Sequence, residues 1–233
     1  MTLTYSTYVS SLANMLIVAV TDPGFQAMIP NCLDDAELFL QRKLDLVDST
    51  VRDTSATFTL STRNFSLPTT LGTFIVVDQM NVITPAGITN AENGTRHSLI
   101  PASIDTLDAL WPSSSGSTIP VYFAMMNQDL AIVGPWPDQT YNIEVVGTQR
   151  FTPLYVSQTT SPLSVFFPDL LLAWSLVFAS GYQRNFGSMA DDPKMAMSWK
   201  AHADDLLADA ITEENKKKGL IGHNAMPMPK AGG

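Results

Sequence analysis

The stretch TFIVVDQMNVIT, residues 73–84, decides how this chain folds. It is rich in β-branched and aromatic residues, which favour a strand. Apolar and polar residues already alternate before it, as in Ala56, Phe58 and Leu60, and further strands are predicted at residues 121–126, 129–133 and 141–148. Because no crossover helices separate these strands, the pattern predicts an antiparallel meander in a small sheet or barrel, not a doubly wound nucleotide-binding fold.

The connections between these strands carry their own signals. Residues 127–129 (NQD) are typical of a tight hairpin, and residues 134–138 (GPWPD) of a longer, rigid one. A short helix is predicted from Ile104 to Leu110, because Ser103 can cap it and Pro112 follows its end.

Two helices are predicted before the strands. The first is ended by Asp22-Pro23-Gly24, and the second begins near Asn31, whose side chain can cap it, with Asp34 and Asp35 at the positive end of the helix dipole. Three- and four-residue spacing marks the apolar face of each helix: Tyr8, Leu12, Met15, Leu16 and Ala19 in the first, and Ala36, Phe39, Leu40, Leu44 and Val47 in the second.

Two more helices follow the strands. The first begins at Pro168, runs to Asn185, and is apolar all round over residues 170–178, which predicts the centre of a helical core. The last begins at Asp192-Pro193 and stops at Gly219, with Lys216 to Lys218 at its carboxyl end. Its predicted packed face is Met195, Trp199, His202, Leu206 and Ala210.

The predicted fold class is therefore α+β, a helical bundle from the N- and C-terminal helices with an inserted antiparallel β-rich domain. The expected segments are 1–49 (helices), 50–165 (β-rich), 166–218 (helices) and 219–233 (extended arm). The arm, GLIGHNAMPMPKAGG, lacks periodicity and contains two prolines, so by itself it should be disordered. Its apolar side chains are the candidate partner-binding residues: Leu220, Ile221, Met226 and Met228.

The charge of the chain limits its partners. The net charge is −9, the pI is about 4.6, and no basic cluster exceeds Lys216 to Lys218, which disfavours tight binding to a phosphate backbone. Residues 54–165 hold only ten charged side chains and no lysine. Depletion of charge is typical of surfaces that become buried in protein contacts, so the β-rich segment is expected to lie at interfaces.

Signatures of catalysis, metal binding and membrane insertion are missing from the sequence. Phosphate-binding glycine loops, zinc-binding helices and nucleophile elbows are absent, and His97, His202 and His223 lie far apart, so neither a cofactor nor a metal is predicted. His202 is expected to be packed on its helix, and Cys32 to be buried and inert. The apolar runs 12–20 and 170–178 are too short to span a bilayer.

Two functions of other classes remain open on the residues alone. A small hydrolase, such as a wall-degrading enzyme, could use Asp105, Asp108 or Glu144 as its acid and base. A binding module could use the β-rich segment, with Trp136 as an aromatic platform that holds a sugar or a peptide. In both cases a purely structural role for these side chains is the commoner explanation.

Several strings together resemble one known family, the head-to-tail adaptor (connector) proteins of tailed bacteriophages, of the type between portal and tail in short-tailed virions. These strings run in the family's order through most of the chain, and none is a catalytic signature: NVITP (81–85), PVYFAM (120–125), GPWPD (134–138), GTQR (147–150), FPDL (167–170), SGY (180–182), RNFG (184–187) and DDP (191–193).

The resemblance implies a structural virion protein and no enzyme. Members of this family have helices around a β-rich insertion and assemble beneath the portal as a ring, typically of twelve copies, through which DNA passes without sequence-specific binding. The implied partners are the portal protein, a tail nozzle or other tail protein, and further copies of the chain. The implied location is the portal–tail junction of a virion made in the host cytoplasm. Two related alternatives are a tail module that binds carbohydrate or a tail fibre through Trp136 and a head-completion protein of a long-tailed phage.

Overall fold

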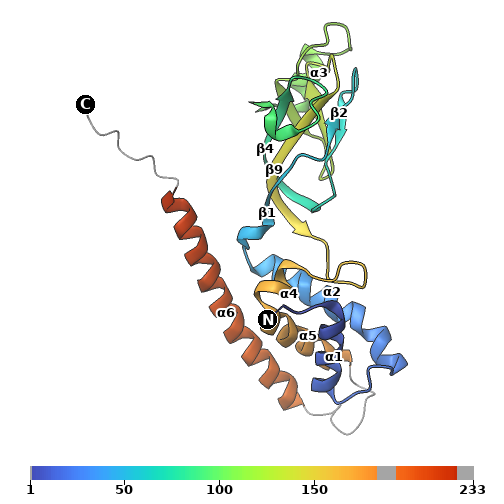
Figure 1. Ribbon diagram of the computed structural model, residues 1–233, viewed down its shortest axis with the longest axis vertical. Helices are drawn as coiled ribbons and strands as arrows, with labels where there is room; N and C mark the ends of the chain where they lie inside the picture. The colour runs from blue at the N-terminus through green and yellow to red at the C-terminus, as the bar shows by residue number, and fades with distance from the viewer. Residues whose placement is uncertain (1, 183–192, 225–233) are drawn as a thin grey trace, which may run out of the picture. The chain divides into compact units, whose positions relative to one another are not determined.

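The computed structural model describes residues 2–182 and 193–224, with side chains for residues 2–180 and 197–220. The described chain forms two compact units (Figure 1). Residues 1–48 and 152–233 make up the helical unit, and residues 49–151 make up the β-rich unit. Helices from both ends of the chain thus flank an inserted β region, which confirms the predicted α+β class.

The helical unit begins with α1 (Tyr5–Leu16), α2 (Pro23–Lys43) and the 3-10 turn η1 (Val47–Ser49), which reaches the β-rich unit. It resumes with α4 (Pro162–Phe166), α5 (Pro168–Tyr182) and α6 (Pro193–Asn224). The apolar stretch predicted as the core lies on α5, where Leu170, Leu171 and Leu176 are all buried. Helices α1, α2, α4 and α6 all contact α5.

The start of α2 differs from the prediction. Asp22-Pro23-Gly24 begins this helix instead of ending α1, because the Asp22 carboxylate accepts a hydrogen bond from the Phe25 backbone N–H at 2.8 Å and Pro23 occupies the first turn. Asn31 therefore lies inside the helix, just after Pro30. An internal proline costs about 3 kcal/mol, which burial of neighbouring Phe25 and Ile29 offsets.

The end of α6 also differs. The helix continues through Gly219 to Asn224, so the predicted stop at Gly219, and the extended form of residues 219–224, are wrong. A glycine within a helix costs only about 1 kcal/mol relative to alanine, and the lysines before it favour helix. The predicted helix end at Asn185 and the predicted cap at Asp192 lie outside the described residues.

The packed face of α6 agrees with the predicted face at Ala210 but includes Ala203 in place of His202. Ala203, Ala210 and Glu214 are buried, whereas His202 is exposed, contrary to its predicted packing. The two alanines follow a seven-residue spacing, and their small side chains allow α6 to lie close to α5. Leu206 and Trp199, which were predicted on this face, are partly buried. Met195 lies outside the residues with described side chains.

The β-rich unit contains two sheets. The first has the order β1 (Thr50–Asp53), β9 (Tyr141–Phe151), β4 (Gly72–Thr84), β5 (Thr95–Ser98), and β2 (Thr57–Phe58) also pairs with β9. The second has the order β3 (Asn64–Ser66), β8 (Leu130–Gly134), β7 (Tyr122–Met125), β6 (Ile100–Pro101). A common core joins them, with side chains such as Phe65 and Phe123 from one sheet and Met80 and Val145 from the other.

The strand connections correct the predicted meander. The hairpin at residues 127–129 does join antiparallel β7 and β8. However, β8 and β9 belong to different sheets, so residues 134–138 carry the chain between sheets and form no hairpin. The long strand β9 pairs instead with β4, the only described strand of greater length, because that pairing satisfies the most backbone hydrogen bonds. β6 and β7 are parallel.

Two short helices complete the units, and only one of them was predicted. The short helix α3 (Ile104–Leu110) forms as expected, with Ser103 as its cap, and buries Leu107 against Ala124 and Ile132 of the second sheet. The helix α4 was not predicted. It lies at residues 162–166, within the stretch expected to be β-rich, and is begun by a capping box between Ser161 and Ser164.

Candidate partner-binding surface

The candidate partner-binding residues fall at the end of α6. Leu220 is 69% exposed, so its side chain is accessible to a partner. Ile221 lies on the same helix, but its side chain is not described. Met226 and Met228 lie outside the described residues, so the structure does not test whether these four side chains act together.

The preceding turns of α6 are firmly attached to the helical unit. Glu214 is buried, and its Oε2 accepts a hydrogen bond from the backbone N–H of Val47 at 2.8 Å. Lys218 forms an ion pair with Asp45. Both contacts tie α6 to the segment that follows α2. The sequence gave no clear signal for Glu214, although its spacing of four from Ala210 places it on the packed face.

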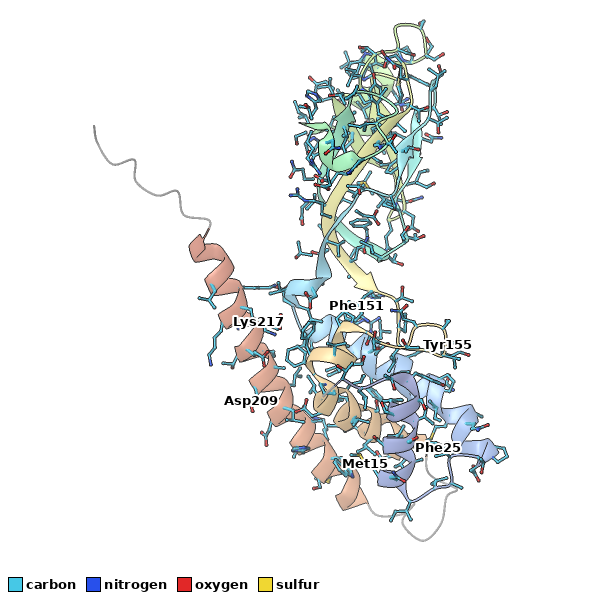
Figure 2. The ribbon with its side chains drawn as sticks, viewed as in Figure 1. Met15, Phe25, Phe151, Tyr155, Asp209 and Lys217 are labelled. Carbon is cyan, nitrogen blue, oxygen red and sulfur yellow. The ribbon has the colours of Figure 1, made fainter. Side chains whose placement is uncertain are left out.

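Lys217, labelled in Figure 2, contacts two aromatic rings of the helical unit. Its Nζ lies 5.1 Å from the ring centroid of Phe167 and 5.5 Å from that of Phe166. Hydrogen bonds to Glu213 and Glu214 raise its pKa above the ordinary value. Two of the three lysines predicted only to balance the helix dipole thus make tertiary contacts. Residues 219–224 continue the helix beyond these contacts.

Two of the three candidate acids of a hydrolase, Asp108 and Glu144, are engaged by arginines. Asp108 forms an ion pair with Arg63, and Asp105 is exposed on the same helix, α3. Glu144 lies on β9, in the other sheet from the one that α3 packs against. Among the described residues, no hydrogen bond joins any two of these three carboxylates, so they do not form an acid–base pair.

Glu144 is held in its charged form. Its Oε1 accepts a hydrogen bond from Asn81 at 2.9 Å, and its Oε2 accepts one from Arg96 at 2.8 Å. Arg52 lies 3.7 Å from Oε2. Burial by itself would raise the pKa of Glu144, but these partners outweigh it, and the pKa lies below the ordinary value. A carboxyl group that stays ionised is poorly suited to act as a general acid.

Trp136, the candidate platform for a sugar or fibre, is half-buried. Its indole N–H donates a hydrogen bond to the backbone carbonyl of Trp111 at 3.0 Å. That bond fixes the ring against the loop that follows α3. The side chain thus stiffens the connection between the two sheets, and no specific feature favours a stacking platform.

The histidines and the cysteine are similarly accounted for where they are described. His97 Nε2 lies 2.9 Å from the Thr84 hydroxyl, and His202 is exposed beside Trp199. Cys32 is buried as predicted, and desolvation raises the pKa of its thiol to about 12. Within residues 2–182 and 193–224, no group of three or more potential ligands could hold a metal ion.

The helices also bear on membrane insertion. In the part of the chain that the structure describes, none is both long and apolar enough to cross a bilayer.

This chain is similar to one family of known proteins. No curated protein matches the chain. The model of one protein family, described as SU10 adaptor protein, matches residues 3–221, which include the described parts of all the helices and strands except the last residues of α6. That match covers nearly the whole sequence and confirms the resemblance to phage head-to-tail adaptors. The chain therefore belongs to the SU10 adaptor protein family.

Proposed function

We propose that this protein forms a ring between the portal vertex and the tail of a phage particle and that DNA passes through the ring. Its membership of a phage adaptor family supports a structural role in the virion. The observation that carries the portal contact is the free end of α6. The helix continues from Gly219 to Asn224 beyond the ion pair of Lys218 with Asp45, and it presents Leu220 to solvent.

An exposed helix end of this kind suits insertion into a groove. Because this end of α6 is already helical, it would lose little conformational entropy when its apolar side chains are bound in a groove. Leu220 and Ile221 would enter an apolar groove between portal subunits, with Met226 and Met228 following. Methionine adapts to irregular apolar surfaces, which suits a contact repeated around a ring.

The charge of the chain supports passage of DNA. Each copy carries a net charge of −9, so a ring of several copies would have a strongly acidic field. Phosphates would be repelled from any lumen that these charges line, and DNA would slide instead of binding. We propose no catalytic role, because Asp108 and Glu144 are already engaged by arginines.

Capture by purified portal protein tests the α6 contact. Deletion of residues 220–233 should abolish capture, and Leu220→Asp should weaken it at least tenfold, because a desolvated carboxylate is costly in an apolar groove. Ile211→Asp is the matched control, since Ile211 is a partly exposed apolar residue farther back on the same helix. If the deletion variant binds portal as tightly as the full chain does, the proposed contact is wrong.

A further inference from the structure

Two segments of the helical unit that lie far apart in the sequence contain no charged residue. They are residues 2–21 and 152–168. The structure brings them together at the start of α1. The backbone N–H of Leu3 donates to the carbonyl of Ser164 at 2.9 Å, and that of Tyr5 donates to the carbonyl of Thr159 at 3.1 Å. The rings of Tyr5 and Tyr155 lie 5.7 Å apart. These contacts place the two uncharged segments side by side at the start of α1.

Apolar side chains are exposed at both ends of this surface. Met15, Ile17 and Val20 are exposed at the carboxyl end of α1, and Tyr155 and Val156 at its amino end. Figure 2 labels Met15 and Tyr155 at these two places. The helix between them is about 18 Å long. We call this surface the α1 face, and it consists of the five apolar side chains with the exposed polar residues between them: Ser6, Thr7, Ser10 and Asn14.

The backbone is strained at Ile17, one of the three exposed apolar residues at the carboxyl end of α1. Its φ is 56° and its ψ is 43°, in the left-handed region that glycine and asparagine occupy readily and β-branched residues avoid. Glycine is the usual residue where a helix ends this way. The isoleucine side chain is nevertheless 77% exposed, so it contributes almost nothing to the packing of its own unit. Strain of this kind is found where a side chain is needed for function.

The absence of charge indicates what covers the α1 face. A partner of strongly basic character would be matched by acidic side chains, yet this surface has none within the two segments. Copies of this chain, each with a net charge of −9, repel one another. They approach most easily through a surface without charge, and the centres of protein interfaces are depleted of charged residues and rich in aromatic residues and methionine.

We infer that the α1 face is the surface through which one copy contacts the next copy in the ring. This inference rests on the proposed ring function and names the contact within it. A ring requires a head-to-tail contact, so the α1 face of one copy would meet a different surface of its neighbour. Ile17 would become buried only in that contact.

New charges on the α1 face test the inference. Ser10→Lys and Asn14→Lys alter exposed helical positions, and lysine is a good helix former. Ala208→Lys is the matched control, because Ala208 is exposed on the charged side of α6, beside Asp209. Light-scattering mass of the full chain is measured alone and with purified portal protein. The wild type and Ala208→Lys should form a ring. At the same concentration, the two α1 variants should form at least tenfold less of it.

The outcomes separate the inference from the proposed function. If the wild type forms a ring and both α1 variants form it equally well, the inference is overturned and the ring function stands. If the wild type remains a single copy in both conditions, the proposed ring is wrong, and the inference fails with it. Circular dichroism spectra that match the wild type exclude loss of folding as the cause.

Ile17→Gly provides a second, independent measurement. Glycine relieves the backbone strain, so in the Asn14→Lys background, where copies are separate, it should raise the midpoint of thermal unfolding. In the otherwise wild-type chain it should reduce ring formation at least tenfold, because the exposed side chain is gone. A variant that is more stable but assembles less well supports the inference. Undiminished assembly of Ile17→Gly would contradict it.

Discussion

Glu37 of the helical unit and Glu144 of the β-rich unit are both buried, and their pKa values are shifted in opposite directions. In the helical unit, Glu37 of α2 accepts hydrogen bonds from the backbone N–H of Leu154 at 2.9 Å and from the hydroxyl of Ser161 at 2.7 Å. Both donors are neutral. Burial therefore dominates and raises the pKa of Glu37 to about 7. In the β-rich unit, Arg96 outweighs burial and lowers the pKa of Glu144.

The comparison shows that burial alone does not determine how an acid behaves. Glu37 joins α2 to the segment before α4, and Glu144 joins four strands of one sheet through Asn81, Arg52 and Arg96. Each is a structural connection. The charge on the partner decides whether protonation strengthens or weakens that connection.

The largest expected effect is a loss of stability in the β-rich unit alone, caused by a substitution where two of its strands pack closely. Gly147 of β9 lies against β4, and a Cβ built there would be 2.1 Å from the carbonyl oxygen of Val76. The Gly147→Ala variant should therefore lose about 3 kcal/mol of the stability of the β-rich unit, because backbone atoms must move apart. Hydrogen exchange of peptides from residues 49–151 measures this loss.

The control for Gly147→Ala is the helical unit of the same variant. Its peptides should exchange as in the wild type, because the two units have separate cores. Equal loss of protection in both units would show that they unfold together.

A smaller effect comes from pH. The pKa of Glu37 rises from 4.5 in the unfolded chain to about 7 in the folded unit, so the folded state binds the proton more tightly. The stabilisation is complete below pH 4.5 and is lost as the pH rises through 7, and about 2.5 kcal/mol of it disappears between these two pH values. Denaturant unfolding of the helical unit between these pH values should show this loss.

Glu37→Gln is the control for that prediction, because glutamine keeps an acceptor but does not titrate. The difference in unfolding free energy between wild type and variant should therefore change with pH. In hydrogen exchange, the pH-dependent change in protection should be confined to peptides of the helical unit. A pH-independent difference would show that Glu37 does not titrate in this range.

The smallest expected effect comes from substitution of Gly219, which, unlike Gly147, has free space around it. Gly219 lies within α6, and a Cβ there would meet nothing within 4 Å. Gly219→Ala should therefore stabilise the end of the helix by about 1 kcal/mol, through helix propensity alone. Slower hydrogen exchange of residues 215–224 would show this gain. Faster exchange would indicate that the helix normally ends near Gly219.

The local elements were predictable because their signals are local. The β4 strand, the helix α3 with its Ser103 cap and the apolar α5 follow from residue spacing. The start of α2 at Asp22-Pro23-Gly24 was predicted wrongly, because a capping residue followed by proline is typical both of a helix start and of a turn that ends a helix. The family was recognisable from short strings, and the family model confirms it.

The candidate binding surfaces were only partly predictable. Leu220 was found from its apolar character, and its exposure fits that prediction without testing it. The α1 face was not predicted, because it needs two segments about 140 residues apart to meet.

The sequence by itself determined the α+β class, the acidic charge and the absence of recognisable catalytic motifs, since these depend on composition and short-range pattern. Only the tertiary structure decided that β9 pairs with β4, that residues 134–138 join two sheets, and that Glu37 and Glu144 receive different partners. The physical reason is that strand pairing and buried hydrogen bonds connect residues far apart in the chain, and periodicity in one segment contains no information about its partner.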